Sequence, residues 1–267
     1  MTLFQHILWG YELTYPNSWV HQKIKDTDVF VSKLEALEPD YEGSEAGQLQ
    51  IRCEWNWARQ NVEPLWNEQL GKIAGIVGAK SIGSAPWRIG DATGIEAEIV
   101  MPKKDKNRLW TGILMHEFCV LHFMVIHPKE AREFFELEAT RIISSLQFPK
   151  SIAGASTTLE GLPLPPNFEP TDPQLVLNDI GDVRNWRAFT GEAEVGALQS
   201  FYLRELAAHH WEIVEYVPYT NLTELGFARY RLQKENQSLT LGLMPSEKVD
   251  PITGQTQANI VYKITTA

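Results

Sequence analysis

Glu96 and Glu98 are the two residues whose type and spacing come closest to acid–base chemistry. They alternate with apolar residues, as in a β-strand, so their side chains leave the same face about 7 Å apart. Pairs of carboxyl groups near that separation act as acid and base in glycoside hydrolysis. A strand with one face in water shows the same alternation without any reaction, and we adopt that interpretation. No catalytic residue is therefore predicted.

Histidine and cysteine would bind a metal ion only where several of them meet on one side of a strand. His116, His122 and His127 lie on or beside one predicted hairpin, which also carries Cys119. Cys119 and His122 are three positions apart, so a regular strand points them to opposite faces. A tetrahedral metal site needs its ligands on one side. We predict no metal and no cofactor, and expect these histidines to be hydrogen-bonded.

The two cysteines, Cys53 and Cys119, lie in separate predicted strands and lack the CxxC spacing of metal and redox motifs. We predict buried free thiols; a disulfide between neighbouring strands is the alternative. The first residues lack the basic and apolar regions of a signal peptide. The longest apolar run, Phe118–Ile126, is about half the length of a membrane span. A cytoplasmic protein without a membrane span is expected.

Other signatures of enzymes and of nucleic-acid-binding proteins are missing from the sequence. It contains no GxSxG, no P-loop and no HExxH motif. The formal net charge is −10, which disfavours nucleic acid, because duplex binding requires clustered cations. The basic run Lys103–Arg108 is predicted to be a solvated hairpin turn, with a contact site as the alternative.

The nine tryptophans indicate a different activity, the binding of a protein partner. Trp55 and Trp57 share one face near the end of a predicted strand, with Arg59 close by, and Trp19 ends a turn after another strand. Tryptophan and arginine are enriched at the energetic centres of protein interfaces. We predict partner contacts at Trp19, Trp55, Trp57 and Arg59. Core packing is the alternative for Trp55 and Trp57.

A first domain of strands and two helices must position these side chains. One helix is predicted over Val62–Val77, where apolar residues recur at the helical period, and a second within Glu130–Phe148. Strands connected by hairpins give a mostly antiparallel sheet, and helices packed on it form an α/β sandwich. From alternation and turn residues, strands are predicted at Tyr11–Tyr15, Asp28–Leu34, Gln48–Trp55, Trp87–Ile89, Gly94–Met101, Leu109–Met115 and Phe118–Ile126.

A change of composition divides the chain into two domains. Residues 150–161 are mostly small and polar and precede a proline-rich stretch, which indicates a linker between domain one, 1–149, and domain two, 162–267. Domain two is predicted to place one helix, Glu192–His209, on an antiparallel sheet. Its extended segments are expected at Leu175–Asp179, Asn185–Phe189, Glu212–Tyr216, Gly226–Gln233, Ser238–Met244 and Asn259–Thr265. The predicted fold class is α+β in two domains.

Two segments that bracket the first domain carry a resemblance to a known family. The stretch Gly10–Val20, GYELTYPNSWV, and the closing helix Phe134–Phe148, which ends on Ser-Leu-Gln-Phe, resemble the PsbP-like α/β sandwich superfamily over residues 8–149. The resemblance implies an α/β/α sandwich and a largely non-enzymatic, protein-binding role. The second domain is similar only to modules of bacterial proteins whose role is unknown.

Three hypotheses of function follow from these observations. The preferred one is a non-catalytic protein-binding module of the bacterial cytoplasm, with an acidic surface and an unnamed protein partner. The second is a chaperone or adaptor for apolar client segments, which would use an apolar groove, often at a dimer interface, so a homodimer stays open. The third is small-ligand binding in a cleft between the domains.

Overall fold

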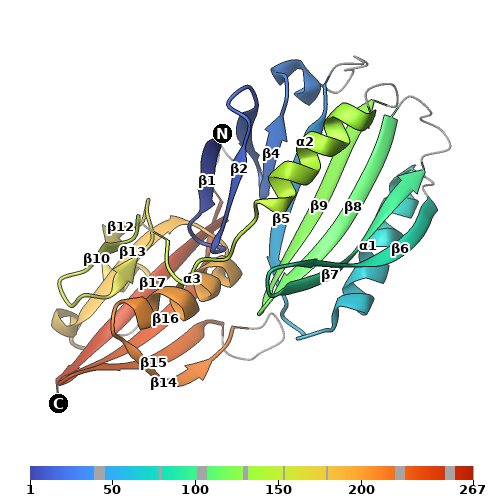
Figure 1. Ribbon diagram of the computed structural model, residues 1–267. Coiled ribbons are helices and arrows are strands. Elements are labelled where there is room, and N and C mark those ends of the chain that lie inside the picture. The colour runs from blue at the N-terminus through green and yellow to red at the C-terminus, as the bar shows by residue number, and fades with distance from the viewer. Residues whose placement is uncertain are drawn as a thin grey trace. The chain divides into compact units, whose positions relative to one another are not determined.

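The chain folds into two compact units with helices packed on mostly antiparallel sheets (Figure 1). One unit consists of Met1–Gln5 and Tyr11–Phe148, the other of His6–Gly10 and Pro149–Ala267. The predicted α+β class, with two domains and a sandwich in the first, is confirmed. The computed structural model describes residues 1–38, 46–77, 80–100, 107–128, 132–152, 154–178, 180–219, 226–249 and 256–266.

The first unit is built on a seven-stranded sheet in which every neighbouring pair is antiparallel. Its hairpins follow from turns between alternating segments. A separate two-stranded sheet contains β1 (Thr2–His6) and β2 (Tyr11–Tyr15). The seven strands lie in the order β3 (Val20–Ile24), β4 (Thr27–Val31), β5 (Gln48–Trp55), β9 (Cys119–Pro128), β8 (Asn107–His116), β7 (Ala92–Val100) and β6 (Lys80–Ile89).

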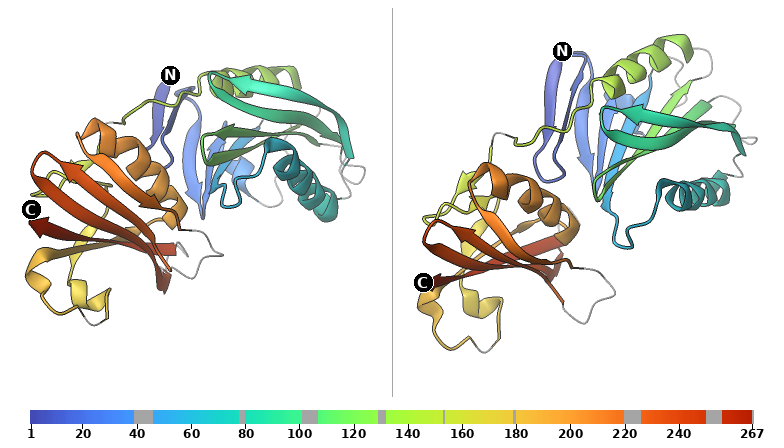
Figure 2. Two further views of the ribbon diagram at one scale, coloured as in Figure 1. Left: turned by 90° about the horizontal axis from the view of Figure 1, so that it is seen from below. Right: turned by 60° about the horizontal axis from the view of Figure 1, so that its bottom comes forward.

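Two helices pack on opposite faces of this sheet (Figure 2). Helix α1 (Val62–Val77) has the predicted bounds and contacts β7 and β8. Its buried Trp66 and Ile73 join the apolar side chains of these strands in one core. Helix α2 (Arg132–Ser144) contacts β2 and β9 on the other face through a buried stripe that includes Ile142.

The helices leave part of each face uncovered. A helix is about 10–12 Å wide, whereas seven strands at about 4.8 Å spacing span roughly 29 Å. On the α2 face, Trp87 of β6 and Trp110 of β8 remain half-exposed. On the α1 face, β5 presents polar residues, among them Arg52 and Glu54, that are also half-exposed. The uncovered strands are therefore where side chains are available to a partner.

The second unit places one helix, α3 (Val195–Ala208), on a six-stranded antiparallel sheet, as Figure 2 also shows. Leu198, Phe201 and Leu206 of α3 form a core with the sheet. The short strands β10 (Ser156–Thr157) and β11 (Pro163–Leu164) form a separate pair. The six strands lie in the order β12 (Glu169–Thr171), β13 (Trp186–Glu192), β17 (Thr256–Thr266), β16 (Gln237–Val249), β15 (Ala228–Lys234) and β14 (Glu212–Val217).

Several predicted segments differ from the structure in detail, and two of the differences have a clear physical reason. Residues 175–178 of the segment predicted to be extended are not a strand: Pro173–Leu175 is a 3-10 helix, whose start is capped by the Asp172 carboxylate accepting from the Gln174 amide. The strand predicted to reach Leu34 ends at Val31, because Val31 pairs with Gln48, the first residue of β5. Strands β1 and β3 were missed because they lack a buried alternating face. Residues 103–106 of the predicted basic turn lie outside the described residues.

We expect Gly94→Ala to disrupt the first unit. A Cβ at Gly94 would overlap the backbone carbonyl oxygen of Ile113 on the neighbouring strand, and backbone cannot move aside as a side chain can. The expected loss is at least about 3 kcal/mol of unfolding free energy, measured by urea denaturation.

Gly71→Ala is the matched control for this substitution. Gly71 lies on α1 with nothing within 4 Å of its added Cβ, so alanine should stabilise by about 0.5–1 kcal/mol through helix propensity. Equal stability of the Gly94→Ala variant and the native chain would contradict the β7–β8 pairing.

Candidate functional site

The predicted partner-binding residues separate into two places. Trp19 is 5% exposed, and its indole N–H donates to Glu138 of α2 over 2.8 Å. Trp19 directly precedes β3. The first residue of β3, Val20, pairs with Val31 of β4, and Val31 pairs in turn with Gln48 at the start of β5. Trp55 ends β5, seven residues on, or about 23 Å along the strand. The structure therefore brings Trp55, Trp57 and Arg59 together but places Trp19 elsewhere.

The cluster around Trp55 is satisfied by its own contacts. Trp55 is buried and packs on Trp57 and Phe118, at ring distances of 6.5 and 5.4 Å. The Arg59 guanidinium lies 4.9 Å from the centre of the Phe118 ring. Asn56 holds this loop, because its side chain bonds the backbone of Gln60 in both directions, at 2.8 and 2.9 Å. Partner binding by these residues stays a prediction.

A second aromatic group lies on the uncovered part of the α2 face. Strand register places Trp87 opposite Gly94, Glu96 opposite Gly112, and Glu98 opposite Trp110, so these side chains share one side of the sheet. We call Trp87, Glu96, Glu98, Trp110 and Gly112 the tryptophan face.

The two tryptophan rings of this face stand nearly perpendicular. Their centroids are 5.3 Å apart, with 87° between the ring planes. Trp87 also meets Phe123 of β9 edge to face, at 5.1 Å and 82°. Such T-shaped pairs are favoured by the ring quadrupoles. The rings are therefore held in place before any partner arrives.

Gly112 allows the rings of Trp87 and Trp110 to pack directly against the backbone of the sheet. A Cβ at this position would lie 2.9 Å from Cζ3 of Trp87 and 3.1 Å from Cη2 of Trp110. In its register the glycine stands between Glu96 on β7 and Phe123 on β9. Any larger residue would lift the rings away from the sheet.

Glu96 is the carboxyl group of the tryptophan face that contacts a ring. Its Oε2 accepts a hydrogen bond from the Trp110 indole N–H at 3.1 Å. Burial raises the pKa of Glu96, and the hydrogen bond from Trp110 offsets part of that rise. Within the described ranges no ion pair involves this carboxylate. The face therefore combines two aromatic surfaces with a carboxyl group that accepts a hydrogen bond and that no described cation neutralises.

A histidine network on the α1 face has a structural explanation. His122 Nε2 lies 2.9 Å from Glu54, and its Nδ1 contacts the Gln69 side-chain oxygen. The Gln69 amide donates to Thr111 at 2.6 Å, and the Thr111 hydroxyl donates to the Phe123 carbonyl at 2.9 Å. This chain of bonds ties α1 to the sheet.

The charge state of Glu54 follows from the same network. Burial alone would raise the pKa of Glu54, but the hydrogen bond and charge of His122 outweigh it, so the pKa is lowered.

In the part of the chain that the structure describes, no three His, Cys, Asp or Glu side chains are grouped to hold a metal ion.

Cys53 and Cys119 are both free and buried. They are diagonal neighbours on one face, because Cys53 pairs with Leu121 and Trp55 with Cys119. Burial, together with the neighbouring Cys119 thiol, raises the pKa of Cys53 well above its usual range. A thiol protonated at neutral pH is a poor nucleophile, so this pair has the properties of core residues.

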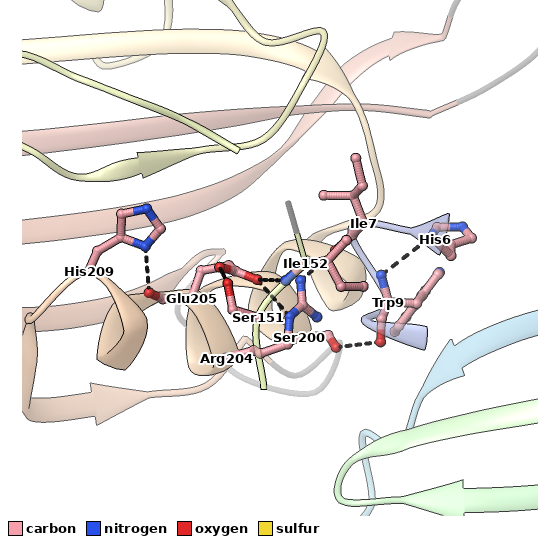
Figure 3. A network of polar contacts seen from close by, with 9 residues as sticks. All are labelled: His6, Ile7, Trp9, Ser151, Ile152, Ser200, Arg204, Glu205 and His209. Carbon is pink, nitrogen blue, oxygen red and sulfur yellow. Dashed lines mark hydrogen bonds and ion pairs between the residues drawn. The ribbon is translucent and has the colours of Figure 1, made fainter. Parts of the chain in front are cut away.

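The second unit contains a buried carboxylate network on α3 (Figure 3). Glu205 is fully buried and accepts from the Arg204 side chain at 2.8 Å, the Ser151 hydroxyl at 2.8 Å and the Ile152 amide at 3.2 Å. A buried carboxylate needs several donors to offset its lost hydration. The network therefore fastens the segment after Pro149 to the helix.

The same helix also holds the segment His6–Gly10. Figure 3 shows Arg204 and Ser200 reaching it: Arg204 donates to the Ile7 carbonyl, and Ser200 donates to the Trp9 carbonyl at 3.2 Å. Gly10 has φ +79°, and a Cβ there would collide with the Arg204 guanidinium. The polar groups of this network are used to hold backbone, which leaves them no free role in chemistry.

Two hollows in the described residues lack charged groups. One of about 290 Å³ lies beside α1 and is lined by Leu70, Gly71, Ile73, Ala74, Ser81 and Ile99. The other, of about 580 Å³, is lined by Gln174, Leu177, Asn178 and Ile180. Binding sites for small molecules place a few polar groups precisely within an apolar lining. Neither hollow matches the tryptophan face as a candidate site.

Comparison with known proteins finds similar solved structures but identifies no particular activity. No protein-family profile matches the sequence, and a search of curated proteins finds no match either. Among solved structures, cyanobacterial PsbP from Synechocystis sp. PCC 6803 is similar over 55% of this chain and 92% of its own, with 14% identity and a TM-score of 0.42.

Two further structures give comparable scores. The Ran-binding protein Mog1p of Saccharomyces cerevisiae is similar over 55% of this chain and 94% of its own, with 8% identity and a TM-score of 0.39. A protein from Bacteroides thetaiotaomicron VPI-5482 is similar over 90% of this chain and 85% of its own, with 10% identity and a TM-score of 0.39. At such scores no residue role transfers to this chain.

The tryptophan face was only partly visible in the sequence. The alternation of Glu96 and Glu98 placed both on one face, and the register confirms that geometry. The sequence does not reveal that Trp87 and Trp110 lie beside these two glutamates, because local spacing does not contain the register between strands. The Trp-x-Gly spacing of Trp110 and Gly112 on one strand face was the available signal.

No helix among the described residues is long and apolar enough to cross a membrane.

We expect Glu205→Gln to loosen the second unit. An amide keeps the shape of the carboxylate but turns an N–H₂ group toward donors and removes the charge that Arg204 neutralises. The expected loss is about 2–4 kcal/mol of unfolding free energy, with faster amide exchange at Ile152 and along α3 by mass spectrometry. Glu212→Gln, at an exposed position of β14, should change neither. Unchanged exchange in both variants would rule out the network as a clamp.

We expect Glu96→Gln to stabilise the protein at neutral pH. An acid whose pKa is raised by folding binds its proton more tightly in the folded state. Its contribution to stability is present below the unfolded pKa, about 4.3 for glutamate, and is lost as the pH rises through the folded pKa. The variant should therefore exceed the native chain by up to about 1 kcal/mol at pH 7, a range that allows for solvent screening.

The check is thermal unfolding of both proteins between pH 3.5 and 7.5, with the difference closing at the acidic end. A variant that is less stable at pH 7 would show that Glu96 already has a compensating partner within the fold.

Proposed function

We propose that this chain is a non-catalytic protein-binding module of the bacterial cytoplasm, and that the tryptophan face is its contact surface. The observation that carries the proposal is the half-exposed, perpendicular pair of Trp87 and Trp110, seated on Gly112 beside Glu96. Tryptophans held rigidly lose little conformational entropy on binding, which is why they recur at interface hot spots.

The chemistry of the described side chains favours binding over catalysis. The His122 and Glu205 networks are closed by hydrogen bonds that hold α1 and α3 in place. The Cys53 thiol is buried and its pKa is raised. The tryptophan face offers a hydrogen-bond acceptor and aromatic surface, which serve recognition.

Two properties of the chain support the compartment and the type of partner. Cys53 and Cys119 are neighbours without forming a disulfide, as expected in a reducing cytoplasm. The tryptophan face mixes aromatic and acidic groups, which suits one specific partner better than the varied apolar segments that a chaperone would shield.

The proposal is tested by selecting a random peptide library, displayed on phage, against the immobilised full chain. Ala85→Arg serves as the blocked variant, because Ala85 is exposed on β6 and pairs with Glu96 across the strands. Ser81→Arg is the matched control: Ser81 is exposed on the same strand but pairs with Ile99, whose side chain belongs to the α1 face.

We expect enriched peptides to bind the native chain and Ser81→Arg alike, and Ala85→Arg at least tenfold more weakly, since a long side chain would cover the rings. A selection that enriches no peptide, or only peptides that ignore Ala85→Arg, would overturn the proposal. Both variants should keep the native far-UV circular dichroism, because both changes are at exposed positions.

A further inference from the structure

We propose that the tryptophan face recognises an arginine side chain in a basic segment of its protein partner. The inference rests on the proposed function and specifies the chemistry of the partner. It is carried by the corner formed by Trp87 and Trp110 and by the carboxylate of Glu96 beside it.

The geometry suits a flat cation. Two rings at 87° to one another present a ring face and an edge to the same space, and the negative face of an indole attracts a cation. A guanidinium is planar and weakly hydrated, so it stacks on a ring while its N–H groups reach a carboxylate. The Trp110 N–H holds one oxygen of Glu96 in position for that contact.

The charge of the site also favours a cation. Glu96 is half-buried, and the one hydrogen bond that it accepts from the described side chains comes from a neutral indole. Placing a guanidinium against it would supply the compensation that the described part of the fold does not. The raised pKa of Glu96 agrees with this, because burial without a cation disfavours the ionised form. The overall charge of −10 adds long-range attraction for a basic segment.

Other aromatic rings of the same chain show what a satisfied site looks like. Arg59 lies 4.9 Å from the Phe118 ring centre, Lys263 5.6 Å from that of Trp186, and Lys234 5.6 Å from that of Trp211. Among the described residues no cation occupies the equivalent position over Trp87 or Trp110. The tryptophan face has the aromatic and acidic parts of a cation site, and a partner would supply the cation.

The edge of the sheet favours recognition by side chains over the addition of a strand. β6 is the edge strand next to the face, and it is interrupted by a bulge at Gly83, which has φ +65°. Pro86 follows on the same strand and has no N–H to donate. Bulges and prolines protect edges from pairing with another chain. A partner segment would therefore reach the rings with a long side chain.

The test uses the full-length chain and a heptapeptide, Gly-Arg-Gly-Arg-Gly-Arg-Gly, with its lysine and citrulline counterparts. Citrulline has the shape of arginine without its charge. Binding is followed by the indole ¹H–¹⁵N signals, assigned to Trp87 and Trp110 through Trp→Phe variants. We expect the arginine peptide to shift both signals, the lysine peptide to bind several-fold more weakly, and the citrulline peptide at least tenfold more weakly.

Glu96→Gln separates recognition from folding. We expect it to weaken the arginine peptide at least tenfold while keeping or raising the melting temperature, so lost binding cannot be attributed to unfolding. Glu68→Gln removes an exposed glutamate of α1 that is paired with Lys72 at 2.7 Å, and should leave the affinity unchanged. Equal weakening by both variants would indicate general attraction to an acidic protein and would overturn the inference.

The two proposals fail in different ways. If the phage selection enriches peptides that depend on the tryptophan face but lack arginine, and the arginine heptapeptide shifts neither indole signal, the arginine inference is wrong and protein binding stands. If the selection enriches nothing that Ala85→Arg blocks, the proposed function itself is wrong. Binding of the arginine and citrulline peptides with equal affinity would also exclude recognition of charge.

Discussion

The width of the seven-stranded sheet is the constraint on which the first unit depends. Two helices of ordinary diameter cannot cover strands that span roughly 29 Å, so each face keeps an uncovered part (Figure 1). On the α1 face the uncovered strands present polar residues such as Arg52 and Glu54, which are stable in water. On the α2 face they present Trp87 and Trp110. Burying large aromatic rings would stabilise the fold, and that stabilisation is lost where the rings are half-exposed. The exposed rings of the α2 face are therefore more informative about function than the exposed polar residues of the α1 face.

The charged groups of the chain divide according to how well they are compensated. Glu205 is completely buried but receives three donors, and Glu54 lies beside His122, so each helps to hold a helix in place. Among the described residues, Glu96 receives a donor only from the Trp110 indole N–H. Local arrangements that cost stability tend to occur at functional sites, because the rest of the fold carries their cost. The contrast between these carboxylates distinguishes the structural networks from the surface that we propose for recognition.

The sequence predicted regular elements well where burial followed a period. The apolar repeat of α1 gave its bounds at Val62 and Val77, and the alternation of β5 gave Gln48 and Trp55. Prediction failed where burial is not periodic: β3 is an exposed edge strand, and the 3-10 helix at Pro173–Leu175 is stabilised by the capping carboxylate of Asp172. Those structures depend on one hydrogen bond or one neighbouring strand, which no local pattern encodes.

The sequence by itself determined that Glu96 and Glu98 share one face of a strand, since side chains alternate along any extended backbone. It also determined the α+β class, because helical and alternating periods occur in separate segments. Only the tertiary structure decided what stands beside Glu96. The side chains of this site come from four strands: Trp87, Glu96, Trp110 and Phe123. They are brought together because β6 pairs with β7, β7 with β8, and β8 with β9. Register sets such neighbours, and a shift by one residue would move each side chain to the opposite face.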